Sequence, residues 1–212
     1  MFLNSIQLHN YRNYKELELT TDNQVNLFVG PNAQGKTNLL EAIFALALTK
    51  SHRTSKDKEL IGWEADSARI HGVVEKRYGT VKLDLMYSTQ GKKARINGLE
   101  QRKLSDFIGS LNVVMFAPED LEIVKGTPGI RRRFLDMEIG QVQPGYLHTL
   151  TQYTKVLAQR NNYLKTASPG SSQQEMLEIW NMQLAEHGVK IMKKRKHFIH
   201  KLQRWAEQIH SG

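Results

Sequence analysis

Residues 30–37 have the residue types and the spacing of a phosphate-binding loop. Glycine stands at positions 30 and 35, and Lys36 and Thr37 follow directly. Glycines let backbone N–H groups curl around a polyphosphate, lysine reaches the β- and γ-phosphates, and the hydroxyl ligates Mg²⁺. The pattern therefore predicts a site for ATP and Mg²⁺, with Thr37 as the metal ligand. Its residues are Gly30, Pro31, Asn32, Ala33, Gln34, Gly35, Lys36 and Thr37.

The segments on either side of this loop have the patterns of a strand and a helix. Residues 25–29, which are apolar except for Asn26, predict a buried strand leading into the loop. Residues 38–48 predict the helix that leaves it, with one apolar stripe facing a core. The stripe consists of Leu39, Leu40, Ile43, Phe44 and Ala47. A strand before and a helix after is the setting in which such a loop binds phosphate.

Further strands are predicted from alternation of apolar and polar residues. These segments are 5–9, 16–20, 69–74, 81–87 and 93–96, and the last ends at the turn Asn97-Gly98. They indicate an antiparallel layer with one face in water. The continuous apolar run 111–116 predicts a second buried strand of the nucleotide-binding sheet.

The remainder of the chain has helical patterns. Thr127 and Pro128 suit a helix start, and Gly140 is expected to stop that helix. A second helix is predicted over about 146–165, a linker over 167–172, and a long helix over about 173–209, with a possible kink at Gly188. The two long helices suggest an antiparallel hairpin. The predicted domains are therefore part of a head, 1–125, and an incomplete helical lobe, 126–212.

Composition narrows the class of protein. The 212 residues have a net charge of +9, and residues 151–212 contribute +6 of it, with 10 Lys and Arg against 4 Asp and Glu. Such a basic end is compatible with nucleic acid, although a solvated helix face is the commoner reason for a basic run. The chain has no cysteine, which excludes disulfides and thiolate zinc sites. We expect a cytoplasmic protein without a membrane span.

Several motifs together resemble one known family. They are segments 8–14, 30–43, 116–121, 126–136 and 159–162. In combination they resemble RecF, a recombination ATPase related to SMC proteins and ABC-type heads. The resemblance covers essentially the whole chain. It implies an α/β P-loop NTPase head of the ABC/SMC type, with a mixed sheet and an antiparallel β layer, followed by a helical second lobe.

The resemblance also implies a function in DNA replication and repair. It suggests that the complete protein binds ATP and DNA at gaps or ends and promotes recombinase loading on single-stranded DNA. The partners expected from it are RecR and RecO, and the complete protein would form an ATP-dependent homodimer. Two alternatives from other classes are a small-molecule P-loop kinase and a non-catalytic DNA-binding module.

Individual residues are carried over from the resemblance. Arg12 and Arg53 stand where this superfamily places basic residues near the nucleotide. The glutamine that usually contacts Mg²⁺ is missing, and Glu119 or Asp120 would replace it. No serine-glycine-glutamine signature and no strand ending in adjacent carboxylates is recognisable. We therefore expect the N-terminal portion of a RecF-like protein, which does not hydrolyse ATP alone.

Two basic clusters are candidate DNA contacts. They are Arg131, Arg132 and Arg133, and Lys193, Lys194, Arg195 and Lys196. Backbone phosphates attract such clusters independently of DNA sequence.

Overall fold

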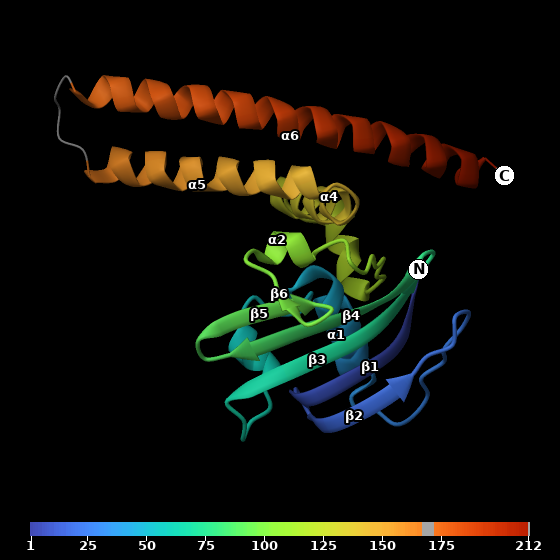
Figure 1. Ribbon diagram of the computed structural model, residues 1–212. Coiled ribbons are helices and arrows are strands. Elements are labelled where there is room, and N and C mark those ends of the chain that lie inside the picture. The colour runs from blue at the N-terminus through green and yellow to red at the C-terminus, as the bar shows by residue number, and fades with distance from the viewer. Residues whose placement is uncertain (167–171, 212) are drawn as a thin grey trace. The chain divides into compact units, whose positions relative to one another are not determined.

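The computed structural model describes residues 1–166 and 172–211. The chain divides into two compact units, Met1–Ala117 and Pro118–Gly212. Figure 1 shows a sheet with helix α1 in the first unit and long helices in the second. None of the described helices is long and apolar enough to cross a bilayer.

The first unit is built on a six-stranded antiparallel sheet with the order β2-β1-β3-β4-β5-β6. The strands are β1 Phe2–Tyr11, β2 Tyr14–Thr20, β3 Ser67–Lys76, β4 Gly79–Ser88, β5 Gly91–Ile96 and β6 Leu99–Glu100. The antiparallel layer predicted from alternation is confirmed, because Ile70, Leu83 and Leu85 face the core and their neighbours do not. Asn97 and Gly98 have φ of 50° and 83°, as a tight hairpin turn requires.

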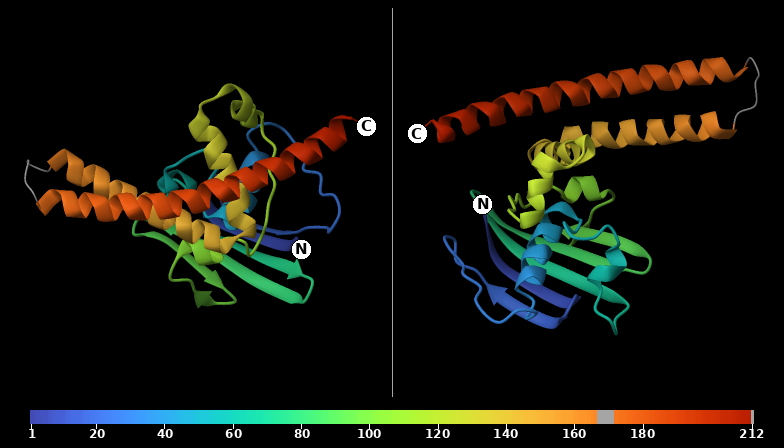
Figure 2. Two further views of the ribbon diagram at one scale, coloured as in Figure 1. Left: turned by 90° about the horizontal axis from the view of Figure 1, so that it is seen from above. Right: turned by 180° about the vertical axis from the view of Figure 1, so that it is seen from behind.

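Helix α1, Lys36–Leu48, covers one face of this sheet, as Figure 2 shows from behind. Its residues Ala42, Ala45 and Leu46 have no exposed surface. A Cβ atom on Gly72 of β3 would lie 2.4 Å from Cδ2 of Leu46, so glycine allows the close approach of helix and sheet. One member of the predicted stripe is wrong, since Leu40 is 47% exposed. The short helices η1 Asp57–Leu60 and α2 Leu104–Phe107 complete the unit.

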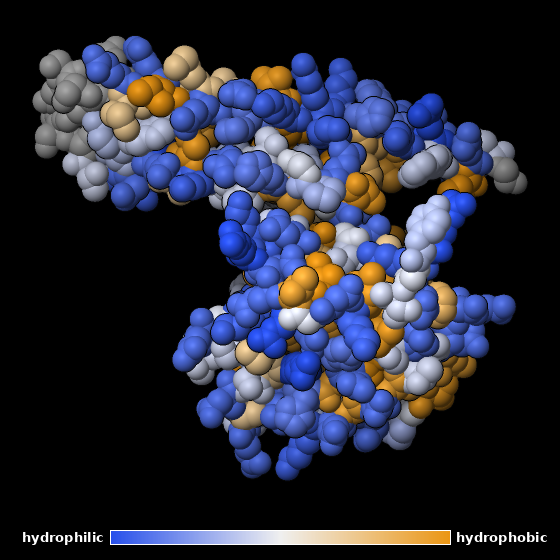
Figure 3. All heavy atoms as spheres, in the orientation of Figure 1, coloured by the Kyte–Doolittle hydropathy of each residue, from blue (hydrophilic) through white to orange (hydrophobic). Residues whose placement is uncertain are grey.

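Two predicted strands do not form. Residues 25–29 and 111–116 belong to no strand. Val25, Leu27 and Val29 are 82–84% exposed, and Phe116 is 91% exposed. A strand buried on both faces needs hydrogen-bonded neighbours on both sides, and among residues 1–166 and 172–211 no strand pairs with either segment. Figure 3 shows apolar residues exposed on the surface of the first unit.

The second unit is helical. Its elements are η2 Pro118–Leu121, α3 Glu122–Lys125, α4 Pro128–Val142, α5 Pro144–Thr166 and α6 Ser172–His210. The predicted start of α4 is confirmed, because Thr127 is extended and Pro128 occupies the first turn. The predicted stop at Gly140 is wrong, since α4 continues to Val142. Gly140 is instead a contact point, where a Cβ atom would lie 2.6 Å from Cδ2 of Leu147 in α5.

Helices α5 and α6 lie side by side in Figure 1 and in the right-hand view of Figure 2, which confirms the predicted hairpin. Ile139, Tyr146 and Ile191 form the buried cluster that joins α4, α5 and α6. Gly188 lies inside the continuous helix α6, so the possible kink does not interrupt it. The predicted linker lies outside the described residues, except that Ser172 begins α6.

Candidate nucleotide-binding site

The loop of residues 30–37 ends at the N-terminus of α1. Gly35, the residue before the helix, has φ of 101°, a left-handed value that favours glycine. A Cβ atom there would lie 2.7 Å from Oη of Tyr14, so the Tyr14 side chain would have to shift to admit one. The free N–H groups of the first helical turn and the helix dipole favour an anion at this end.

Lys36 lies across its own loop. Its Nζ donates hydrogen bonds to the backbone oxygens of Gly30, at 2.6 Å, and Pro31, at 2.5 Å. Phosphate oxygens are acceptors of the same kind, so a polyphosphate can take over these bonds. Thr37 is exposed on the first turn. These groups can bind a nucleotide phosphate, and the assignment of residues 30–37 as the site stays a prediction.

Arg12 is held by a buried acid of α1. It occupies the turn between β1 and β2 with φ of 54°. Its Nε donates to Oε2 of Glu41 at 2.9 Å, and its Nη2 donates to Oε1 at 2.7 Å. The Glu41 side chain has no exposed surface, and that of Arg12 is 19% exposed. This bidentate pair fixes the guanidinium against α1.

Arg53 approaches the same acid from the loop after α1. Its Nη1 lies 3.7 Å from Oε2 of Glu41 and donates to Oδ1 of Asn38 at 2.9 Å. Asn38 in turn donates to Oδ1 of Asn13 at 2.8 Å. The Arg53 side chain is 42% exposed. The structure thus brings both predicted arginines to the first two turns of α1.

Glu41 and Ser51 are absent from the residues that the sequence predicts for the site. Burial by itself raises the pKa of the Glu41 carboxyl, but hydrogen bonds from Arg12 and Ser51 outweigh this, so its pKa lies below the ordinary value. One signal in the sequence could have indicated it. A single acid in an apolar helix that packs on a sheet requires cationic partners, because an isolated buried charge is too costly.

The two catalytic candidates lie in the second unit. Glu119 and Asp120 belong to η2. The side chain of Glu119 lies outside the part of the chain that is described, and that of Asp120 is exposed. Neither is assigned a role by the geometry of the first unit, so a catalytic function for them stays a prediction.

Two of the predicted DNA contacts hold the helical unit together. Nη1 of Arg131 donates to the backbone oxygens of Ile123, Val124 and Gly126. Arg131 thus provides a donor to carbonyl oxygens at the C-terminal end of α3. Arg195 donates to both carboxylate oxygens of Asp136, at 2.8 and 2.7 Å. The other members of the clusters are exposed: Arg132, Arg133, Lys193, Lys194 and Lys196.

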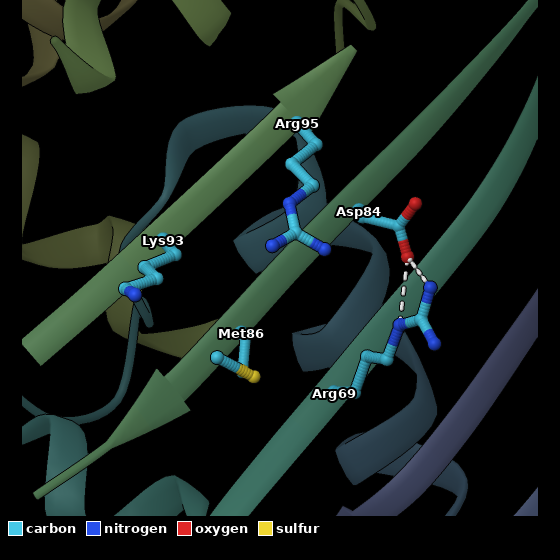
Figure 4. Close-up of a pocket in the computed structure, with 5 residues that line it drawn as sticks. All are labelled: Arg69, Asp84, Met86, Lys93 and Arg95. Carbon is cyan, nitrogen blue, oxygen red and sulfur yellow. Dashed lines mark hydrogen bonds and ion pairs between the residues drawn. The ribbon is translucent and has the colours of Figure 1, made fainter. Parts of the chain in front are cut away.

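A basic hollow lies on the water-facing side of the sheet (Figure 4). It is lined by Arg69, Asp84, Met86, Lys93 and Arg95. Arg69 donates through both Nε and Nη2 to Oδ1 of Asp84, the only acid lining the hollow. The hollow measures about 100 Å³, whereas small-molecule sites usually measure about 300–1,000 Å³. It is therefore a positively charged surface and not a second nucleotide pocket.

Comparisons with known proteins agree with this geometry. Over its full length the chain is 57% identical to the "DNA replication and repair protein RecF" of Bacillus cytotoxicus and to that of Bacillus cereus (strain AH820). It spans 57% of the length of each of these relatives.

Two solved structures have the same fold. They are described as the recombination mediator protein RecF with ATP and RecF-ATPrS, both in the RecFOR pathway. Each is 36% identical, with TM-scores of 0.90 and 0.89, and the match covers 96% of this chain and 55% of theirs. The AAA domain family matches residues 5–204. The chain therefore belongs to the AAA domain family, and it resembles the RecF proteins over its whole length.

Proposed function

We propose that this chain is the nucleotide-binding segment of a RecF-type DNA replication and repair protein and that it binds ATP at residues 30–37. The observation that carries the proposal is the loop itself. The residue before α1 is a glycine with a φ of 101°, a conformation that side chains rarely adopt, and the lysine ammonium is held over the loop at the N-terminus of α1. The similarity to a RecF structure described with ATP supports the same assignment.

Each group in the loop has a separate task. The first N–H groups of α1 bind phosphate oxygens, and Lys36 moves from the carbonyl oxygens of Gly30 and Pro31 to the β- and γ-phosphates. The Thr37 hydroxyl would supply one oxygen to Mg²⁺, and the ion would neutralise phosphate charge. No group of three acids or histidines among the described residues could hold a metal. Mg²⁺ would be held by the Thr37 hydroxyl together with the nucleotide phosphates.

For the complete protein we propose a role at DNA gaps or ends in the cytoplasm. There it would form an ATP-dependent homodimer, act with RecR and RecO, and promote recombinase loading on single-stranded DNA. The names of the relatives support replication and repair, and the RecFOR pathway named for the solved structures supports a mediator role.

The substitution Lys36→Ala tests ATP binding. It removes the cation that faces the β- and γ-phosphates, so ATP affinity is expected to fall at least tenfold, or by about 1.4 kcal/mol. The fold is expected to persist, because Lys36 bonds only to carbonyl oxygens of an exposed loop. Isothermal titration calorimetry with ATP and Mg²⁺ measures the affinity, and a melting curve checks the fold.

Lys50→Ala is the matched control, because Lys50 is an exposed lysine at the other end of α1. It is expected to leave ATP affinity unchanged. Equal affinity of the parent and the Lys36→Ala chain, with normal melting of both, would show that residues 30–37 are not the ATP site.

DNA binding is expected to depend on the exposed lysines of α6. Replacing Lys193, Lys194 and Lys196 with glutamine leaves the Arg195–Asp136 pair intact. Each lost phosphate contact reduces the slope of log affinity against log salt by about 0.9. Fluorescence anisotropy with gapped DNA at several salt concentrations measures this slope.

The control removes the same charge elsewhere, by replacing the exposed residues Lys15, Lys50 and Lys58 with glutamine. Its slope is expected to match that of the parent. A slope that changes equally in both triple variants would assign the effect to net charge and not to α6.

A further inference from the structure

Glu41 is the only charged residue of α1 besides Lys36, and it has no exposed surface. It follows Thr37 by four residues, so both side chains lie on the same side of the helix, one turn apart. Two separate segments meet at its carboxylate: the β1–β2 turn through Arg12, and the loop after α1 through Ser51 and Arg53. Both predicted arginines of the nucleotide site therefore depend on one buried acid.

The two arginines are not bound equally. Arg12 makes two hydrogen bonds to Glu41 and is mostly buried, whereas Arg53 has one contact at 3.7 Å and is 42% exposed. A bidentate pair is stronger and better oriented than a single long contact. Arg12 is thus committed to Glu41, and Arg53 retains donors that can reach a ligand.

The Ser51 hydroxyl connects the Glu41 carboxylate to the backbone of Arg53 by hydrogen bonds. The Ser51 hydroxyl donates to Oε1 of Glu41 and accepts from the backbone N–H groups of Arg53, at 2.9 Å, and Thr54, at 3.1 Å. The acid therefore holds Arg53 at two points, through its main chain and through its guanidinium. The guanidinium also donates to Asn38, which follows Thr37 directly. This places it on the first turn of α1, beside the phosphate loop.

We propose that Glu41 is a positioning residue of the nucleotide site, which keeps Arg12 as a structural brace and holds Arg53 ready to contact the phosphates. The inference rests on the proposed function, because it presumes that residues 30–37 bind ATP. Glu41 itself is covered by its partners and does not touch the ligand.

A double-mutant cycle on the 212-residue chain tests this role. Calorimetry with ATP and Mg²⁺ is performed on the parent, Glu41→Gln, Arg53→Ala and the double variant. Loss of a charge-assisted contact is expected to weaken ATP binding about tenfold in Arg53→Ala. Glu41→Gln is expected to weaken it by a similar factor, and the double variant is expected to bind like Arg53→Ala alone. A purely structural role would not produce this dependence on Arg53.

Ser51→Ala provides a second route, since it keeps the Glu41 charge and the Arg12 pair. It is expected to weaken ATP binding about threefold in the parent and not at all in the Arg53→Ala chain. If Glu41→Gln does not fold, Ser51→Ala still tests whether Glu41 positions Arg53 for ATP binding. Glu41→Asp, which retains the charge, is expected to recover part of the affinity lost in Glu41→Gln.

Three results would overturn the proposal: unchanged affinity in folded Glu41→Gln and Ser51→Ala chains, losses that add to those of Arg53→Ala, or tighter binding in Glu41→Gln. Tighter binding would show that Glu41 competes with the nucleotide for Arg53. Failure of the proposed function is a different outcome, in which the parent chain and Lys36→Ala have the same ATP affinity.

Discussion

Replacing Arg12 with alanine is expected to lower the free energy of unfolding of the first unit by about 3–5 kcal/mol. The change removes the bidentate partner of Glu41 and leaves a carboxylate with no exposed surface. Arg53 at 3.7 Å and Ser51 remain, but neither replaces two short charged hydrogen bonds. Urea unfolding at neutral pH, followed by far-UV circular dichroism, measures the difference.

Arg69→Ala is the matched control for this experiment. Arg69 also donates two hydrogen bonds to an acid in the first unit, but its side chain is 55% exposed and that of Asp84 is 16% exposed. A solvated pair of this kind contributes about 0–1 kcal/mol. Equal destabilisation by both substitutions would show that burial of Glu41 is not the cause.

The cost of Arg12→Ala is also expected to depend on pH. In the parent the folded pKa of Glu41 is lowered, so its stabilising contribution is present above the unfolded pKa of about 4.3 and is lost as pH falls through the folded pKa. Without Arg12, burial raises that pKa, and protonation then relieves the unpaired charge. The difference between parent and variant is therefore expected to shrink as pH falls from 7 to about 4.

Asp136→Ala is expected to destabilise the helical unit by about 2–3 kcal/mol. Asp136 of α4 accepts two hydrogen bonds from Arg195 of α6 and one from the Tyr146 hydroxyl of α5. Tyr146 is 4% exposed, and burial, followed by the neighbouring Asp136, raises the pKa of its hydroxyl. The variant leaves the Tyr146 hydroxyl without its acceptor and leaves Arg195 with one longer hydrogen bond, from Nε to Oη of Tyr146 at 3.2 Å. The effect is below that of a fully buried pair, because Asp136 and Arg195 are 18% and 20% exposed.

The control for this variant is Glu186→Ala. Glu186 pairs with Lys190 four residues later on α6, and both side chains are more than half exposed. Its removal is expected to leave the free energy of unfolding of the helical unit nearly unchanged, because both partners are solvated. Urea unfolding of the two variants, followed by the helical signal at 222 nm, makes the comparison. A cost for Asp136→Ala no larger than that for Glu186→Ala would mean that this network does not join the three helices.

Features set by short stretches of sequence could be predicted. The phosphate loop, the β3–β5 hairpins and the start of α4 depend on glycine spacing, alternation or a proline in the first turn, all within a few residues. The long helix α6 was predicted nearly to its ends for the same reason, since a 3.6-residue period is a local property. The predicted helix end at Gly140 is wrong because a glycine is typical both of helix ends and of close contacts between helices. Only the position of Leu147 in the folded chain distinguishes the two.

Features that depend on distant residues were decided by the tertiary structure. Segments 25–29 and 111–116 have the composition of buried strands, but a strand exists only where other strands supply hydrogen bonds, and none of the described strands does so.

The role of Glu41 also depends on residues that are distant in the sequence. The arginines at 12 and 53 were recognised as candidates, yet their partner Glu41 lies 29 residues from one and 12 from the other. The sequence by itself determined that a phosphate loop opens α1. Only the tertiary structure decided which arginine is bound to the buried acid and which remains exposed, because that depends on how the β1–β2 turn and the loop after α1 pack against the helix.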